Sequence, residues 1–272
     1  MKTPTGASEE KCTVGVFMMQ KNEEQLLPAF IHYYGKLFGY SALHIFDNGS
    51  SQETKHILEN AQELGASVFW DFDRPKHFEK KGQILSEAID ANQDKFSVFL
   101  PLDCDEFIGI CPEEGQYSCD PTEINDYFGS LGPGVYKTCL RLRNHPTVLN
   151  NFAKNRGAAK IFFSKCKAKA MDVGLHTSQN KQRAKTSRVC HFEFHNKPFE
   201  VFVEHARNKM QLRVDVDDLV ALSHYRRRGV HLVPFLLPGG RTAYERSFEN
   251  VDWIETSALQ DAFSCFDIAK PF

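Results

Sequence analysis

Long apolar runs are missing from this sequence. No stretch reaches the roughly 18 consecutive apolar residues that an α-helix needs to cross a bilayer. The first eleven residues are polar and contain no apolar segment typical of a secretory signal. We therefore expect a cytoplasmic protein, with attachment to the inner face of the membrane as the alternative location.

Three common phosphate-binding and nucleophile motifs are also missing. No G-x-G-x-x-G follows the first predicted strand, which disfavours a dinucleotide-binding domain. No G-x-x-x-x-G-K-[ST] is present, which disfavours a P-loop NTPase. No G-x-S-x-G is present, which disfavours an α/β-hydrolase.

The chain has little net charge and no paired-cysteine motif. Its net charge is -2, so the chain as a whole has no general attraction for nucleic acid, and we expect no nucleic-acid partner. The eight cysteines are scattered without C-x-x-C spacing. We expect them to be free thiols in a reducing compartment.

Apolar residues are plentiful and regularly arranged. Of the 272 residues, 42% are hydrophobic and 23 are Phe, which is enough for one sizeable core. Predicted strands at 13–19, 42–46, 66–72 and 96–102 alternate with predicted helices at 26–38, 51–64 and 79–92. This alternation predicts an α/β fold with a mostly parallel sheet flanked by helices.

The pattern loosens after Phe107, where we predict a mixed α+β half. The expected elements are strands at 135–142, 160–165, 168–173 and 188–194, a mobile polar loop at 143–160, and helices at 198–210 and 216–227. The last amphipathic segment, 257–268, is expected to pack back on the chain or to mediate contacts.

Polar side chains follow three of the predicted strands. They are Asn22 and Glu23, Asp47 and Asn48, and Asp103 and Asp105. Because ligands bind at the carboxyl ends of the strands in open parallel sheets, these residues are expected to share one site. Side chains two positions apart on a strand point the same way, and two converging carboxylates suit Mg²⁺ or Mn²⁺.

These residues carry a resemblance to a known family. Three segments resemble those of GT-A-fold glycosyltransferases, in particular a family-2-like group with the motif L-D-x-D-E-F. They are Asn22-Glu23, Asp47-Asn48-Gly49-Ser50 and Leu102-Asp103-Cys104-Asp105-Glu106-Phe107. Gln83, Lys160, His176 and His191 resemble further recurrent residues of this group. The resemblance is specific over residues 12–110, patchy over 155–205 and absent after that.

The resemblance implies a role for each residue. The donor nucleotide would contact Asn22, Glu23, Asp47, Asn48, Gln83, Asp103 and Lys160. Asp103 and Asp105 would hold a Mn²⁺ or Mg²⁺ ion that bridges the donor diphosphate, and His176 and His191 compete to complete that site. The catalytic candidates are Asp105, Glu106, Asp172 and Glu193, because no Glu-Asp pair marks the base.

The resemblance also implies an activity. A single GT-A-like domain over 1–272, with a nucleotide-sugar half at 12–110 and an acceptor half at 111–272, would be an inverting, metal-dependent glycosyltransferase of polysaccharide biosynthesis. The expected donor is a UDP-sugar, and the expected acceptor is a glycan or a lipid-linked sugar, with peripheral membrane association. One alternative is a metal-dependent nucleotidyltransferase, although Gln20-Lys21-Asn22-Glu23 is not a Gly-rich phosphate loop. The other is a non-catalytic nucleotide- or glycan-binding module.

Overall fold

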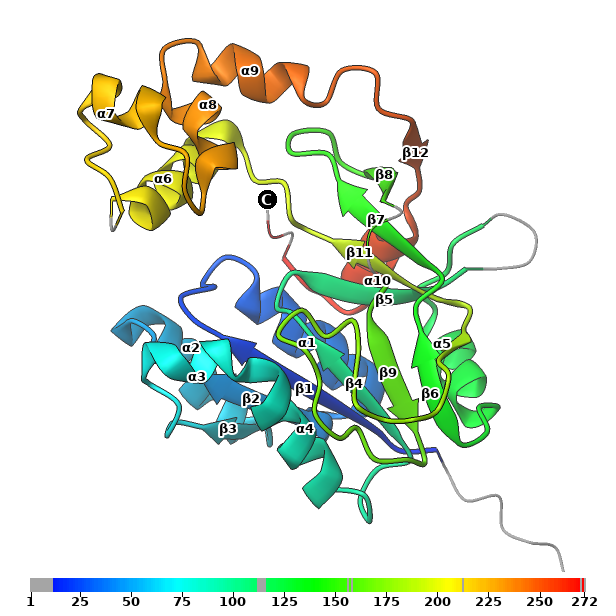
Figure 1. Cartoon of the computed structure of the whole chain (residues 1–272). Helices are drawn as coiled ribbons and strands as arrows, with labels where there is room; N and C mark the ends of the chain where they lie inside the picture. Colours follow the sequence, from blue (N-terminus) through cyan, green and yellow to red (C-terminus); the bar gives the residue numbers. More distant parts are fainter. Residues whose placement is uncertain are drawn as a thin grey trace, which may run out of the picture. The chain divides into compact units, whose positions relative to one another are not determined.

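The computed structural model describes residues 12–111, 116–155, 157, 159–211, 213–269 and 271 (Figure 1). The polar segment 1–11, which contributes to the predicted location, lies outside the described residues. Within the described part of the chain, no helix is both long and apolar enough to span a membrane.

The chain divides into two compact units. Unit 1 comprises the described parts of residues 1–141, 156–192 and 257–271, and unit 2 those of 142–155 and 193–256. Two of the boundaries fall within strands, namely β7 (Leu140–Asn144) and β11 (Val189–Glu193).

Unit 1 is built on a seven-stranded mixed sheet with the order β10-β6-β9-β4-β1-β2-β3. Its strands are β1 (Val14–Gln20), β2 (Leu43–Asp47), β3 (Ser67–Phe69), β4 (Val98–Leu102), β6 (Gly134–Lys137), β9 (Ile161–Ser164) and β10 (Lys185–Thr186). The first four strands pair in parallel, whereas β9 runs antiparallel to β4 and β6. The predicted α/β class, with parallel strands and flanking helices, is confirmed.

Helices connect the parallel strands as expected from the apolar spacing. They are α1 (Leu27–Phe38), α2 (Gln52–Glu63), α3 (Pro75–Glu79) and α4 (Lys81–Ala91), with a short 3-10 turn, η1 (Tyr40–Ala42), after α1. Gly39, with φ of 89°, ends α1, and the hydroxyl of Ser51 accepts the Thr54 N–H at the start of α2. The helix predicted at 79–92 corresponds to α4, and the short helix α3 precedes it, with Lys80 between the two.

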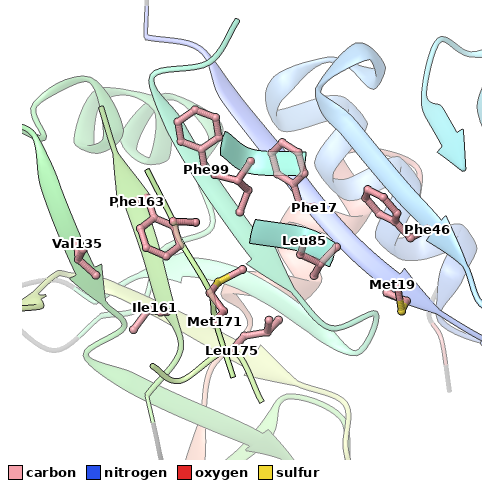
Figure 2. Close-up of a cluster of buried hydrophobic side chains, with 12 residues drawn as sticks. Phe17, Met19, Phe46, Leu85, Phe99, Val135, Ile161, Phe163, Met171 and Leu175 are labelled. Carbon is pink, nitrogen blue, oxygen red and sulfur yellow. The ribbon is translucent and has the colours of Figure 1, made fainter. Parts of the chain in front are cut away.

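One face of the sheet packs against α4 (Figure 2). Four strands each contribute one almost fully buried phenylalanine to this core: Phe17, Phe46, Phe99 and Phe163. Leu85 of α4 is buried with them. Met171 and Leu175, from the segment after β9, complete this core. Because α4 leads into β4, the first turn of α4 lies toward the carboxyl edge of the sheet.

A second aromatic layer of unit 1 joins α1, β5 (Glu106–Ile110) and α10 (Ala258–Cys265). Phe263 lies 5.9 Å from Tyr33 and 5.2 Å from Phe107, measured between ring centroids. The Tyr34 hydroxyl donates to the Glu106 carbonyl at 2.8 Å and so fixes the start of β5. The C-terminal segment therefore packs back on unit 1, as one of the two expectations stated.

Two strand predictions in unit 1 are corrected by the structure. The strand expected at 135–142 is two strands, β6 and β7. Residues 168–173 form no strand, because Lys169 adopts a left-handed φ of 55° and only an isolated bridge joins Met171 to Ser178. Helix α5 (Pro121–Gly129) begins at a side-chain cap, in which the Asp120 carboxylate accepts the N–H groups of Thr122 and Glu123.

Unit 2 combines short strands with small helices. Strand β8 (Asn151–Asn155) pairs antiparallel with β12 (Trp253–Glu255), so the prediction of a loop throughout 143–160 is wrong. The helical elements are α6 (Phe199–Met210), α7 (Leu219–His224), η2 (Val230–Leu232), α8 (Val233–Leu236) and α9 (Gly240–Arg246). Helix α7 is shorter than predicted because Asp218 caps it and it ends at His224.

Candidate functional site

The carboxyl ends of β1, β2 and β4 lie side by side in the sheet of unit 1. In the strand register Gln20 is opposite Asp47, and Met18 is opposite Leu102. The predicted polar segments follow these positions directly. The structure therefore brings Asn22, Asn48 and Asp103 to one edge of the sheet, as parallel pairing requires.

Asp47 and Asn48 hold the loops at this edge together. Asp47 is 1% exposed; one carboxylate oxygen accepts the Gln20 amide at 2.8 Å, and the other accepts the N–H groups of Gly49 and Ser50. The Asn48 amide donates to the carbonyls of Phe72 and Arg74. The bonds from the Asp47 carboxylate to the Gly49 and Ser50 N–H groups close the turn that follows β2.

The other predicted donor contacts of this edge differ in exposure. The Asn22 side chain accepts the Ser51 N–H at 2.8 Å, and Asn22 has a left-handed φ of 54°. Glu23 is half-buried, and its carbonyl accepts the Leu26 and Leu27 N–H groups at the start of α1. Gln83 is exposed on α4 and donates to Glu87 at 2.9 Å.

Asp103 lies between two lysine ammonium groups. Lys81 Nζ is 2.6 Å from Asp103 Oδ1, and Lys160 Nζ is 2.5 Å from Asp103 Oδ2. Burial acts to raise the pKa of Asp103, but Lys160 and Lys81 outweigh it and hold this pKa at about 2. Both oxygens of the carboxylate are thus engaged by cations, an arrangement that opposes a divalent metal ion at Asp103.

Glu106 closes the turn that follows β4. Its Oε2 accepts the Asp103 N–H at 2.9 Å, and its Oε1 lies 3.2 Å from Lys160 Nζ. Burial raises the pKa of Glu106 to about 8, in opposition to Lys160. Such a pKa suits general acid–base chemistry, but Glu106 is only 1% exposed.

Two histidines compete for the predicted metal site. His191, on β11, is fully buried, and within the described part of the chain neither of its ring nitrogens has a hydrogen-bond partner. Burial, assisted by Lys160 and Arg141, lowers the pKa of His191 to about 3, so the ring is neutral. His191 Nε2 lies 3.7 Å from Glu106 Oε1. His176 is half-buried, with Nδ1 3.2 Å from the Ala159 carbonyl.

The remaining catalytic candidates occupy different settings. The Asp172 carboxylate accepts the backbone N–H groups of Gly174, His176 and Thr177, and those of Thr177 and His176 overcome partial burial to lower its pKa. Asp105 is half-buried in unit 1. Glu193 belongs to unit 2, where it pairs with Arg143 at 3.0 Å.

Lys81 is the residue of this cluster that the sequence analysis misses. It is 4% exposed, although its neighbour Lys80 is exposed. Lys81, Leu85 and Ile89 are spaced by four, so they lie on the same face of α4, and this face packs on the core. The helical spacing of Lys81 with Leu85 and Ile89 indicates that this lysine is buried. A buried lysine needs a nearby counter-ion, so this spacing could have identified Lys81.

Comparison with known proteins adds no relative. No protein-family model matches the chain, and a search of curated proteins finds no match.

Proposed function

We propose that this protein is a GT-A-like glycosyltransferase that moves a sugar, with inversion, from a nucleotide-sugar donor to a glycan or lipid-linked acceptor. The supporting observation is the common edge formed by the ends of β1, β2 and β4, with the L-D-C-D-E-F turn at the end of β4. Ligands of open parallel sheets bind at such an edge. A UDP-sugar is the proposed donor.

The predicted metal ligands fit a divalent cation only in part. Asp103 does not fit, because lysine ammonium groups engage both of its oxygens. Asp105 is the carboxylate that we propose for Mn²⁺ or Mg²⁺, and His176 and His191 still compete as the nitrogen ligand. A bound cation would stabilise the negative charge of the departing nucleoside diphosphate. The acceptor hydroxyl would need a carboxylate base within hydrogen-bond reach.

Nucleotide binding is the first test of this proposal. Nucleoside diphosphates, with and without Mn²⁺, are added to the full chain, and the melting temperature is measured. A ligand that binds only the folded state raises this temperature, and we expect UDP with Mn²⁺ to give the largest rise. If no nucleotide changes the melting temperature, the donor-site assignment is rejected.

Two further assays on the full chain distinguish the proposed transferase from a nucleotidyltransferase and from a binding module. A nucleotidyltransferase would respond to nucleoside triphosphates and release pyrophosphate from them. A binding module would respond to the nucleotide but release no UDP from a UDP-sugar. Release of UDP with sugar transfer is the outcome that the proposal requires.

A further inference from the structure

Lys81 and Lys160 form a buried pair of cations that share one partly exposed carboxylate. Each lysine side chain is 5% exposed, whereas that of Asp103 is 31% exposed. Asp103 therefore offers surface to solvent, and the ammonium groups lie against its two oxygens. An anion that replaced the Asp103 carboxylate would meet both ammonium groups at once.

The position of Lys81 reinforces this arrangement. Lys81 is the first residue of α4, a helix of 11 residues with no acidic side chain in its first turn and no side-chain cap. The N-terminal end of a helix carries partial positive charge, so a cation at this place is disfavoured and an anion is favoured. Asp103 supplies the negative charge that the Lys81 ammonium group requires.

We infer that Lys81 and Lys160, with the first turn of α4, form a diphosphate-binding site in which Asp103 is an internal counter-ion that the ligand displaces. Lysine ammonium groups bind phosphate oxygens as point charges, and phosphate offers more acceptor oxygens than a carboxylate. The diphosphate chemistry follows from the lysine pair. Its assignment to a nucleoside diphosphate rests on the proposed function.

This inference reverses the expected effect of one substitution. If Asp103 ligated a metal ion or the donor, Asp103→Asn would weaken diphosphate binding. If Asp103 competes with the ligand for the lysines, Asp103→Asn removes the competitor and strengthens binding. The sign of the change therefore separates the two roles.

The test is calorimetric titration of inorganic pyrophosphate into the full chain in the presence of EDTA. Hydrogen bonds to charged groups contribute about 1.5–3 kcal/mol, so we expect Asp103→Asn to tighten binding by about tenfold or more. Lys81→Met and Lys160→Met should each weaken it by about tenfold or more. Lys80→Met is the matched control, because Lys80 is the exposed neighbour of Lys81, and it should change affinity by less than about twofold.

A charge-balanced variant guards against misfolding of Asp103→Asn, which removes the carboxylate from buried Lys81 and leaves Lys160 with Glu106. Lys81→Met combined with Asp103→Asn removes one cation and one anion together. We expect this double variant to bind pyrophosphate more tightly than Lys81→Met alone. The inference is overturned if Asp103→Asn binds no more tightly than the unmodified chain, or, where Asp103→Asn does not fold, if the double variant binds no more tightly than Lys81→Met.

A parallel titration with UDP identifies the source of the diphosphate. Tighter binding of UDP than of pyrophosphate, with the same order among the variants, assigns a nucleoside diphosphate to the site. Pyrophosphate binding without donor turnover would retain the site and reject the transferase. Donor turnover together with weaker binding by Asp103→Asn would retain the transferase and reject the site.

Discussion

A carboxylate at the end of a parallel strand takes its role from the charges around it. Asp103 is ionised over the physiological range because its pKa is about 2. A metal cation at its oxygens would compete with Lys81 and Lys160. The same two lysines make the position attractive to an anion, so the D-x-D pattern does not by itself define a metal site.

His44 is a second buried polar residue, and it leads to a prediction of pH dependence. Its ring stacks on Phe17 at 4.6 Å between centroids, and among the described residues no group forms a hydrogen bond with either ring nitrogen. Burial, assisted by Lys95, lowers the pKa of His44 to about 4. Since the folded-state pKa is below the unfolded value, His44 contributes stability above about pH 6.5 that is lost as the pH falls through 4.

The His44→Phe variant isolates this contribution. Between pH 7.5 and 4.5 we expect the unmodified chain to lose about 2 kcal/mol more of its free energy of unfolding than His44→Phe loses. Urea unfolding at a series of pH values measures the free energy of unfolding of both proteins. Subtracting one curve from the other cancels the titration of distant groups. His56→Gln, at an exposed position, is the control and should follow the unmodified chain. Parallel curves for His44→Phe and the unmodified chain would contradict the account.

At the level of single residues, the sequence indicates which side chains belong to a site, but it does not indicate which of them contact one another. Motif and resemblance select Asp103 and Lys160, but these residues are 57 positions apart in the chain and the sequence carries no signal that they meet. The sequence does not single out Lys81, because Lys80 and Lys81 are the same residue type. They differ only in which side of α4 they face, the core for Lys81 and solvent for Lys80. Asp47 was selected correctly as an edge residue, while its bonds to the Gly49 and Ser50 N–H groups became visible only in the folded turn.

At the level of helices and loops, the start of α4 lies very close to the backbone of Met171 and Asp172, in the segment after β9. A Cβ atom on Gly82 would lie 2.3 Å from the carbonyl oxygens of both Met171 and Asp172. These are backbone atoms, so they cannot move aside as a flexible side chain would. Only glycine at position 82 lets the loop of Asp172 and His176 lie against the start of α4.

Gly82→Ala is therefore expected to destabilise the protein. Alanine favours a helix interior over glycine by about 1 kcal/mol, but the clash should outweigh this gain and lower the free energy of unfolding by about 1–3 kcal/mol in total. Gly132→Ala is the matched control, because a Cβ there meets nothing within 4 Å. Urea unfolding compares the two variants. Equal stability of both would show that the loop can shift without penalty.

The first four strands and their helices could be predicted because each has a clear apolar period. Residues 168–173 could not, because buried Ala168 and Met171 imitate a strand while Lys169 turns the backbone into the left-handed region. Strand β8 was missed for the opposite reason. Its sequence is polar, and its neighbours in the sheet are β7 and β12, the second of which follows about a hundred residues later in the chain.

At the scale of the whole molecule, the chain order and the compact units differ. Unit 1 takes segments from the beginning, the middle and the end of the chain. Helix α10 returns to it because Phe263 packs against Tyr33 and Phe107. The apolar periodicity of 257–268 indicates that this segment packs against another surface, but it does not identify Tyr33 and Phe107 as the partners.

We propose that the carboxyl edge of the unit 1 sheet turns over a nucleotide-sugar donor. Asp105→Asn tests it against Asp94→Asn, a matched change at an exposed aspartate that precedes β4 instead of following it. The measurement is the rate of UDP release from UDP-sugars by the full chain with Mn²⁺. We predict a loss of about a hundredfold or more for Asp105→Asn and an unchanged rate for Asp94→Asn. An unchanged rate for Asp105→Asn, or no release by the unmodified chain, would contradict the account.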